Sequence, residues 1–206
     1  MRTFVGILFL LFSFTVIGQT KQQLTTALAN IDTRGKAETL IKDHPNWDIA
    51  VVKYGSYDEE TPKKLLKLQE GQSEIIRSET DTYHYKLLDT WNETEFRVSY
   101  IHFNGRALQK TQIDSLRSLI IDAYKKRTPF ETLVATYNMD SNPNKGDLGW
   151  FKPGVMVPEF EKAVRKHKKD AIFTVDVDNR KWYFVVLKTH ANRVVNYRQF
   201  VKVKER

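Results

Sequence analysis

The order of elements between Glu95 and Thr189 constrains the fold of this 206-residue chain more than any other feature. Residues 96–103 alternate between two sets of side chains, as expected for a strand with two packed faces. Helical, loop and strand patterns then follow in a fixed order, at 113–124, 130–137, 138–149, 158–164, 171–177 and 182–187. This order predicts an α+β domain in which a small antiparallel sheet is covered by helices.

Local signals predict where several of these elements begin and end. Thr111, with Asp114 three residues later, resembles a capping box at the start of the first helix. Thr128 as N-cap, with Pro129 at the first helical position, is typical of the start of the second. The turn residues 178–180 join the last two strands into a predicted hairpin.

The part of the chain before this domain is predicted to be a second α+β region. Its expected elements are helices at 24–31, 36–42 and 60–68 and strands at 49–54 and 83–88. A shift of 99 residues lays 60–91 on 159–190 with five identities, which suggests a degenerate repeat of the later domain. Two unrelated α+β segments explain so weak a match equally well.

The first eighteen residues are typical of a secretory signal peptide. Arg2 precedes the apolar run Phe4–Ile17, which is too short to cross a bilayer but long enough for a signal peptide core. Val16 and Gly18 provide small residues at the minus-three and minus-one positions of a cleavage site. We therefore expect cleavage after Gly18, a periplasmic protein and no stable membrane span afterwards; an uncleaved anchor is the alternative.

Four segments result from these patterns. They are a signal peptide at 1–18, an N-terminal α+β region at 19–92, the domain at 93–191 and a basic C-terminal tail at 192–206. The chain has no cysteine, which excludes disulfides, Cys-ligated metals and a thiol nucleophile. Its five histidines show no metal-ligand spacing, and we expect neither a metal nor a cofactor.

The net charge of +8 is the remaining compositional signal. Basic runs at 162–169 and 193–206 have the charge to contact phosphate or anionic lipid. Such runs usually form solvated faces, and no recognised nucleic-acid motif is present. We therefore expect no nucleic-acid partner.

Two glycine-led segments carry the most specific motif. Gly146–Phe151 reads GDLGWF, and Gly154–Glu161 reads GVMVPEFE. Together they resemble the signature of the parvulin-type peptidyl-prolyl cis-trans isomerases, and the resemblance extends from Glu95 to about Thr189. It implies a parvulin-like domain similar to that of exported bacterial foldases.

The same resemblance implies a substrate-binding group of Leu148, Met156, Phe160 and Trp150. A proline ring has no N–H to donate, so an apolar pocket with an adaptable Met suits it. The alternative is that these side chains only fill a core.

The expected catalytic positions depart from the family pattern. Parvulin domains usually carry one His on the first strand, one on the last, and a Cys or Asp in the loop between. The alignment places Tyr100 and Tyr183 at the two His positions and Asp140 at the loop position. His102, two residues along the first strand, is an alternative source of an imidazole.

The resemblance implies an exported prolyl isomerase that assists the folding of secreted or outer-membrane proteins. Its partners would be proline-containing unfolded or nascent exported polypeptides. The two tyrosines favour an alternative, in which a catalytically weakened domain acts as a chaperone or as a structural subunit of an envelope or secretion assembly.

Overall fold

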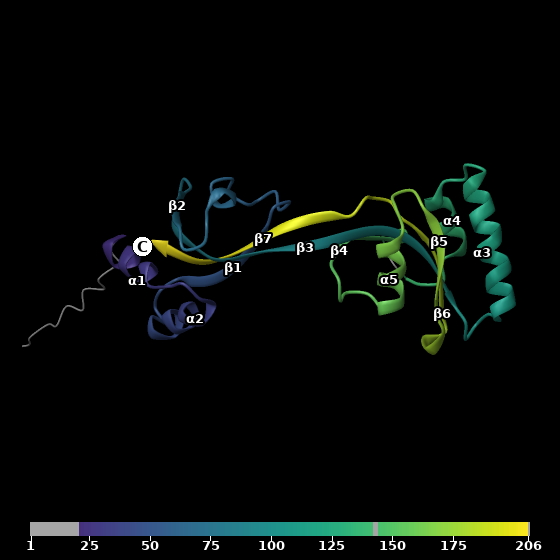
Figure 1. The fold of residues 1–206 in the computed structure, drawn as a ribbon, viewed down its shortest axis with the longest axis horizontal. Coiled ribbons are helices and arrows are strands. Elements are labelled where there is room, and N and C mark those ends of the chain that lie inside the picture. Colours follow the sequence, from purple (N-terminus) through teal and green to yellow (C-terminus); the bar gives the residue numbers. More distant parts are fainter. Residues whose placement is uncertain (1–20, 142–143, 206) are drawn as a thin grey trace, which may run out of the picture. The chain divides into compact units, whose positions relative to one another are not determined.

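The computed structural model describes residues 21–141 and 144–205, which fall into two compact units (Figure 1). One unit lies within Met1–Thr90 and Arg198–Arg206, and the other is Trp91–Tyr197. The expected signal peptide at 1–18 lies outside the described residues. No helix in the described ranges is long and apolar enough to cross a membrane.

Two long strands contribute residues to both units. Strand β3 is Thr82–Asn104 and strand β7 is Arg193–Glu205. The sequence predicted two separate strands at 83–88 and 96–103, but residues 89–95 contain neither Gly nor Pro, so no turn interrupts β3.

The expected basic tail at 192–206 is corrected by the structure, which places β7 there. Four of its apolar residues are buried among lysines and arginines: Val195, Phe200, Val201 and Val203 are at most 2% exposed. The charge pattern concealed a strand that packs on both faces, since the neighbours Phe200 and Val201 belong to different cores.

The second unit contains the domain expected from the sequence. Its helices are α3 (Lys110–Lys125), α4 (Phe130–Tyr137) and α5 (Pro158–Lys166), and its further strands are β4 (Asp147–Phe151), β5 (Ile172–Val177) and β6 (Trp182–Leu187). Strand β3 pairs antiparallel with β4 and with β6, and β6 pairs antiparallel with β5. The predicted hairpin is confirmed, with a short 3₁₀ turn, Asp178–Arg180, between its strands.

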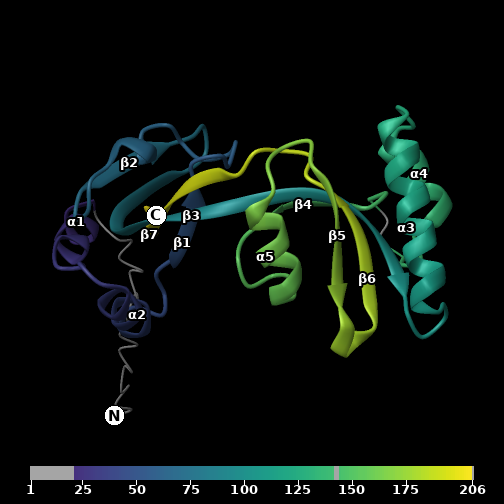
Figure 2. The ribbon, with the colours of Figure 1, turned by 45° about the vertical axis from the view of Figure 1, so that its right-hand side comes forward.

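Helices cover both faces of the β3–β6–β5 sheet. Figure 2 shows α5 on one side of the β5–β6 hairpin and α3 with α4 on the other. The α5 face buries Phe96, Val98, Tyr100, Phe160, Phe184 and Val186, whereas the α3–α4 face buries Ile101, Phe103, Ile113, Ile120, Tyr183 and Val185. Successive residues of one strand therefore belong to different cores.

Two predicted helix caps are wrong. The N-cap of α3 is Gln109, whose capping box partner is Gln112, rather than the pair Thr111 and Asp114. The carboxylate of Asp114 instead binds basic side chains of its own helix. Helix α4 begins after Pro129, without the side-chain cap that was expected from Thr128.

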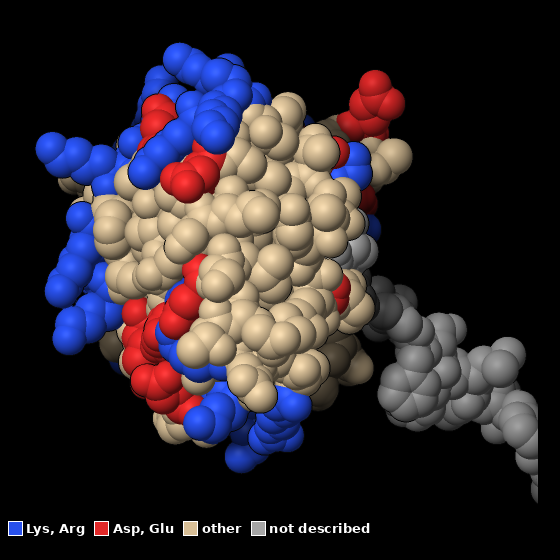
Figure 3. Space-filling view, turned by 90° about the vertical axis from the view of Figure 1, so that its right-hand side faces the viewer, with Lys and Arg blue, Asp and Glu red and all other residues tan. Residues whose placement is uncertain are grey.

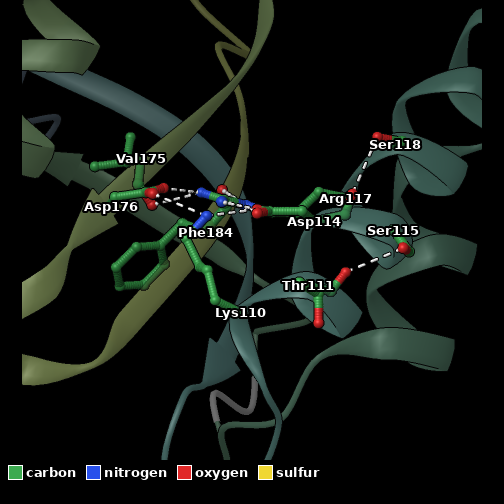
Figure 4. Close-up of polar contacts among 9 residues, drawn as sticks. All are labelled: Lys110, Thr111, Asp114, Ser115, Arg117, Ser118, Val175, Asp176 and Phe184. Atoms are coloured by element: carbon green, nitrogen blue, oxygen red, sulfur yellow. Dashed lines mark hydrogen bonds and ion pairs between the residues drawn. The ribbon is translucent and has the colours of Figure 1, made fainter.

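A buried arginine fastens α3 to the β5–β6 hairpin (Figure 4). Arg117 is 4% exposed, and its guanidinium donates to the Val175 carbonyl at 3.0 Å and to the Phe184 carbonyl at 3.3 Å. It also donates to the carboxylates of Asp114, at 3.0 Å, and Asp176. Burial alone would raise the pKa of Asp176, but Arg117 and Lys110 lower it. The buried charge is thus paired and hydrogen-bonded, as burial requires.

The first unit combines two helices with a mainly antiparallel set of strands. Its elements are α1 (Lys21–Ala29), α2 (Arg34–Asp43), β1 (Ile49–Gly55) and β2 (Ser73–Arg77), together with the first part of β3 and the last part of β7. Strand β2 pairs antiparallel with β3, and β7 lies between β1 and β3.

The predicted helix at 60–68 and the repeat built on it are wrong. Only the 3₁₀ turn Leu65–Lys67 forms, and Leu65 is the one fully buried residue of that segment. Without an apolar stripe the segment cannot pack as an α-helix. The repeat alignment therefore sets a three-residue turn against the nine-residue helix α5.

Figure 3 views the molecule with the right-hand side of Figure 1 facing the reader. Lys and Arg side chains, with some Asp and Glu, gather at the upper, left and lower parts of this face, and a tan area without charged residues occupies the middle and extends to the right. Leu119 of α3 is half exposed. The charge of the chain is therefore unevenly distributed over this face.

Candidate functional site

The polar part of the candidate site joins β3 to the loop that follows α4. The Tyr100 hydroxyl donates to Asp140 Oδ2 at 2.6 Å, and Asn138 Nδ2 donates to Asp140 Oδ1 at 2.7 Å. The backbone N–H of His102 donates to Asn138 Oδ1 at 2.8 Å, and its carbonyl accepts from the Met139 N–H at 3.0 Å. These bonds hold the exposed Asp140 carboxylate at the end of the Tyr100 side chain.

Gly146 allows the loop to return against β3. Its φ is +79°, and its carbonyl accepts from the Tyr100 N–H at 3.0 Å. A Cβ added there would lie 2.4 Å from the Tyr100 carbonyl oxygen. Both the positive φ and the close approach require glycine, as the sequence motif indicated.

The apolar part of the site surrounds the Tyr100 ring. This ring packs edge-on against Phe160 at 6.3 Å and Phe184 at 5.8 Å between centroids. Leu148 and Met156 pack against the same cluster and are only partly buried. Three of the four predicted substrate-binding residues, Leu148, Met156 and Phe160, therefore belong to or pack against the cluster that contains Tyr100. Phe160 is 0% exposed and forms part of the core beneath the two partly exposed side chains.

The first turn of α5 fixes the Met156 backbone. The Glu161 carboxylate accepts from the Gly154 N–H at 2.8 Å and from the Met156 N–H at 2.9 Å. The sequence motif includes Glu161, but its spacing gives no indication of this role. The two bonds hold the turn that presents Met156.

Trp150 lies apart from this group. On β4, Phe151 pairs with Phe96 in the buried cluster, so its neighbour Trp150, paired with Arg97, points the other way. Its ring packs against His190 at 5.3 Å and lies 4.0 Å from the Arg193 guanidinium carbon. The structure does not bring Trp150 to the other predicted binding residues.

Tyr183 also lies elsewhere, because it faces α3. It belongs to the core with Ile101 and Phe103, and Lys110 Nζ lies 5.2 Å from its ring centroid. The β6 residues on the Tyr100 face are its strand partner Val186 and Phe184, whose ring contacts the Tyr100 ring. A shift of one position along a strand reverses the face, and motif alignment without the strand register could not detect it.

His102 lies on the same face as Tyr100 and Phe184. Its ring is 5.2 Å from the Phe184 ring and 6.2 Å from the Trp182 ring between centroids. Within the described residues its buried Nδ1 has no hydrogen-bond partner. Burial lowers the pKa of His102 against the opposing effect of Asp140, so its imidazole is neutral near pH 7.

The described ranges contain no group of three or more His, Asp or Glu residues arranged to hold a metal. The groups assembled here are thus a hydrogen-bonded carboxylate, a phenol, a neutral imidazole and several apolar side chains. Such a set can bind an apolar ring and offer polar contacts at its edge.

Comparison with known proteins identifies the family. The family model described as the PPIC-type PPIASE domain matches residues 82–191, which is more than half of the 206 residues. The chain belongs to this family of parvulin-type peptidyl-prolyl isomerase domains. The match includes all the residues that form the polar and apolar parts described above.

Individual relatives are foldases and chaperones by name. The chain is 32% identical over 116 residues to foldase protein PrsA 1 of Bacillus cereus, a match that covers 55% of this chain and 37% of the relative. It is 28% identical over 120 residues to chaperone SurA of Chromobacterium violaceum, covering 50% of this chain and 27% of the relative. The chain therefore spans only about a third of the length of these relatives.

One solved structure, peptidylprolyl isomerase (PrsA) from Bacillus anthracis, is 27% identical to the chain. The match has a TM-score of 0.39 and covers 48% of this chain and 42% of that one.

Proposed function

We propose that this protein is a peptidyl-prolyl cis-trans isomerase that acts on proline-containing segments of unfolded polypeptides. The observation that carries the proposal is the Tyr100–Asp140 hydrogen bond beside Leu148, Met156 and Phe160, in a chain that belongs to the parvulin family. Polar groups thus lie at the edge of an apolar surface suited to a proline ring.

The reaction needs no covalent intermediate. The barrier to rotation about an X-Pro bond is about 18–20 kcal/mol because rotation breaks amide resonance. Packing the proline ring against the partly exposed Leu148 and Met156 would remove water from the bond. Polar groups held near Asp140 would then bind the twisted amide better than either planar form, which lowers the barrier.

The proposed setting is the periplasm. It is supported by the signal-peptide pattern of residues 1–18 and by relatives named as foldase and chaperone. The clients would be nascent or unfolded secreted and outer-membrane proteins.

A second candidate function is binding without efficient turnover, as a chaperone or as a subunit of an envelope assembly. Phe184 favours it, because the β6 residue that faces Tyr100 carries no polar group. The Tyr100 hydroxyl and the exposed Asp140 carboxylate would then serve to bind a client rather than to turn it over.

NMR exchange spectroscopy on an X-Pro peptide separates the two candidates. Catalysis by the full chain, reduced in Tyr100→Phe and Asp140→Ala, supports the isomerase. Tyr183→Phe is the matched control, since it removes a hydroxyl from the opposite face of the same sheet and should leave the rate unchanged. No acceleration by the unsubstituted protein would reject the isomerase and leave the binding function.

If the binding function holds, co-purification distinguishes its two forms. Recovery of one partner in fixed ratio supports an assembly subunit, whereas recovery of many unfolded clients supports a chaperone.

A further inference from the structure

The first unit contains a large hollow that no part of the proposed function uses. Its volume is about 640 Å³, within the range of about 300–1,000 Å³ that is usual for ligand pockets. Residues of α1, β2, β3 and the segment before β2 form its walls. Its apolar lining includes Leu28, Ala29 and Ile75, and its cationic lining is Lys64, Arg77 and Lys86.

The lining carries more positive than negative charge, because Glu74 is its one carboxylate beside three cationic side chains. The lining residue His84 is paired with Glu205 at 2.8 Å. Lys86 is 6% exposed, and its Nζ donates to the Ala29 carbonyl at the end of α1 at 2.9 Å. An ammonium group has three N–H donors, so this bond uses one of them. Among residues 21–141 and 144–205, no carboxylate forms an ion pair with Lys86 or Arg77 within 4.0 Å.

The nearby carboxylates have other partners. Glu74 Oε1 accepts from the Ile75 N–H at 3.2 Å and lies 3.9 Å from Lys64 Nζ. Asp32 is hydrogen-bonded to Lys36, which is the main reason that its pKa is lowered, while the charge of Lys86 adds a smaller effect. Because a buried charge is costly without a counter-charge, an incoming anion would be stabilised here.

A second hollow adjoins the first and indicates a ligand longer than a single small acid. Its volume is about 330 Å³, and it shares Lys64, Ile75 and Arg77 with the large hollow. It adds Pro62 and Lys63 to the lining. Cationic and apolar side chains are therefore spread over two hollows with shared walls, whereas a phosphate ion would occupy only one point.

We propose that these two hollows bind an extended peptide segment that carries carboxylates. One carboxylate would lie near Lys86 and another near Lys64 and Arg77, while apolar side chains of the segment pack against Leu28 and Ile75. The site lies wholly in the first unit. It goes beyond the isomerase function and does not depend on it.

The test is isothermal titration calorimetry of the full chain with a proline-free peptide in which Glu and Val alternate. A peptide with Gln in place of every Glu is the matched ligand. We expect the Glu peptide to bind at least about tenfold more tightly, with an affinity that falls as salt is raised. Equal affinities would overturn the proposal, and so would displacement of the Glu peptide by an equal concentration of inorganic phosphate.

Paired substitutions locate the site. The double variant Lys64→Gln and Arg77→Gln changes two exposed residues of the lining and should weaken binding roughly tenfold. The control, Lys42→Gln with Lys67→Gln, removes the same charge from exposed residues outside both linings and should change the affinity less than about twofold. Equal weakening by both variants would mean general charge attraction and would overturn the assignment. The peptide has no proline, so these results do not depend on isomerase activity.

Discussion

Lys188 provides a quantitative test of the second unit's packing. Its side chain is 0% exposed at the end of β6, and its Nζ lies 4.8 Å from the Phe96 ring centroid. Within the described residues this Nζ has no hydrogen-bond partner. Burial lowers the pKa of Lys188 to about 8.

The magnitude follows from linkage between protonation and folding. An unfolded lysine has a pKa of about 10.4, and each unit of difference is worth about 1.36 kcal/mol. The buried ammonium therefore costs about 3 kcal/mol below pH 8, offset by about 1 kcal/mol from its contact with the aromatic ring. Lys188→Met should raise the free energy of unfolding at pH 7 by about 2 kcal/mol.

The pH dependence has a definite sign. Because the folded pKa lies below the unfolded one, the unfolded chain binds more protons between pH 8 and about 10.4. Lys188 therefore makes stability rise with pH across this window, by about 2 kcal/mol, because the aromatic contact of the ammonium is lost as the amine deprotonates. The advantage of the Met variant should disappear over the same window.

Urea unfolding followed by tryptophan fluorescence at pH 7 and at about pH 10.4 measures both effects. The quantity to compare is the difference in free energy of unfolding between the unsubstituted protein and Lys188→Met, because other groups titrate equally in both proteins. Lys169→Met, at an exposed lysine nearby in the sequence, is the control and should change stability little at either pH. A Lys188→Met protein that is no more stable at pH 7, or that has the same advantage at both pH values, would contradict a buried ammonium at this position.

Three further predictions concern the framework of the site. Gly146→Ala should lower the free energy of unfolding, measured in urea, by about 2–4 kcal/mol, because the added Cβ would clash with the Tyr100 carbonyl and alanine disfavours the positive φ. A loss below about 0.5 kcal/mol would contradict this contact. Arg117→Met should lower the free energy of unfolding in the same assay by about 2–4 kcal/mol, because it leaves the Val175 and Phe184 carbonyls without their donor. An unchanged free energy would show that these carbonyls find other partners. Glu161→Ala should speed hydrogen exchange at the Met156 amide roughly tenfold without unfolding the domain; unchanged exchange would argue against its role in holding that turn.

The geometry also clarifies why activity needs direct measurement. The β3 position expected for one family histidine carries Tyr100, and its hydroxyl is bonded to Asp140. Phe184, the β6 residue whose ring contacts Tyr100, has no group that could donate or accept a proton. His102 offers a neutral imidazole on that face, but two positions along the strand. Any turnover would therefore use a different set of polar groups from that of the usual family pattern.

Much of the second unit could be predicted because its signals are local. The hairpin of β5 and β6, helix α5 starting at Pro158, and the glycine turn at Gly146 each depend on residues close together in the chain. The predicted helix at 60–68 is wrong, since apolar content alone did not reveal that Leu65 would be the one buried apolar residue of the segment.

The sequence by itself determined the order of elements and the motif that identifies the family, because turn chemistry and side-chain periodicity act over a few residues. Only the tertiary structure decided which side chains meet. The pairing of His102 with Phe184 and of Tyr100 with Val186 places Phe184 on the Tyr100 face and Tyr183 on the other. That register is set by packing between strands about eighty residues apart, and moving it by one position would exchange the two faces.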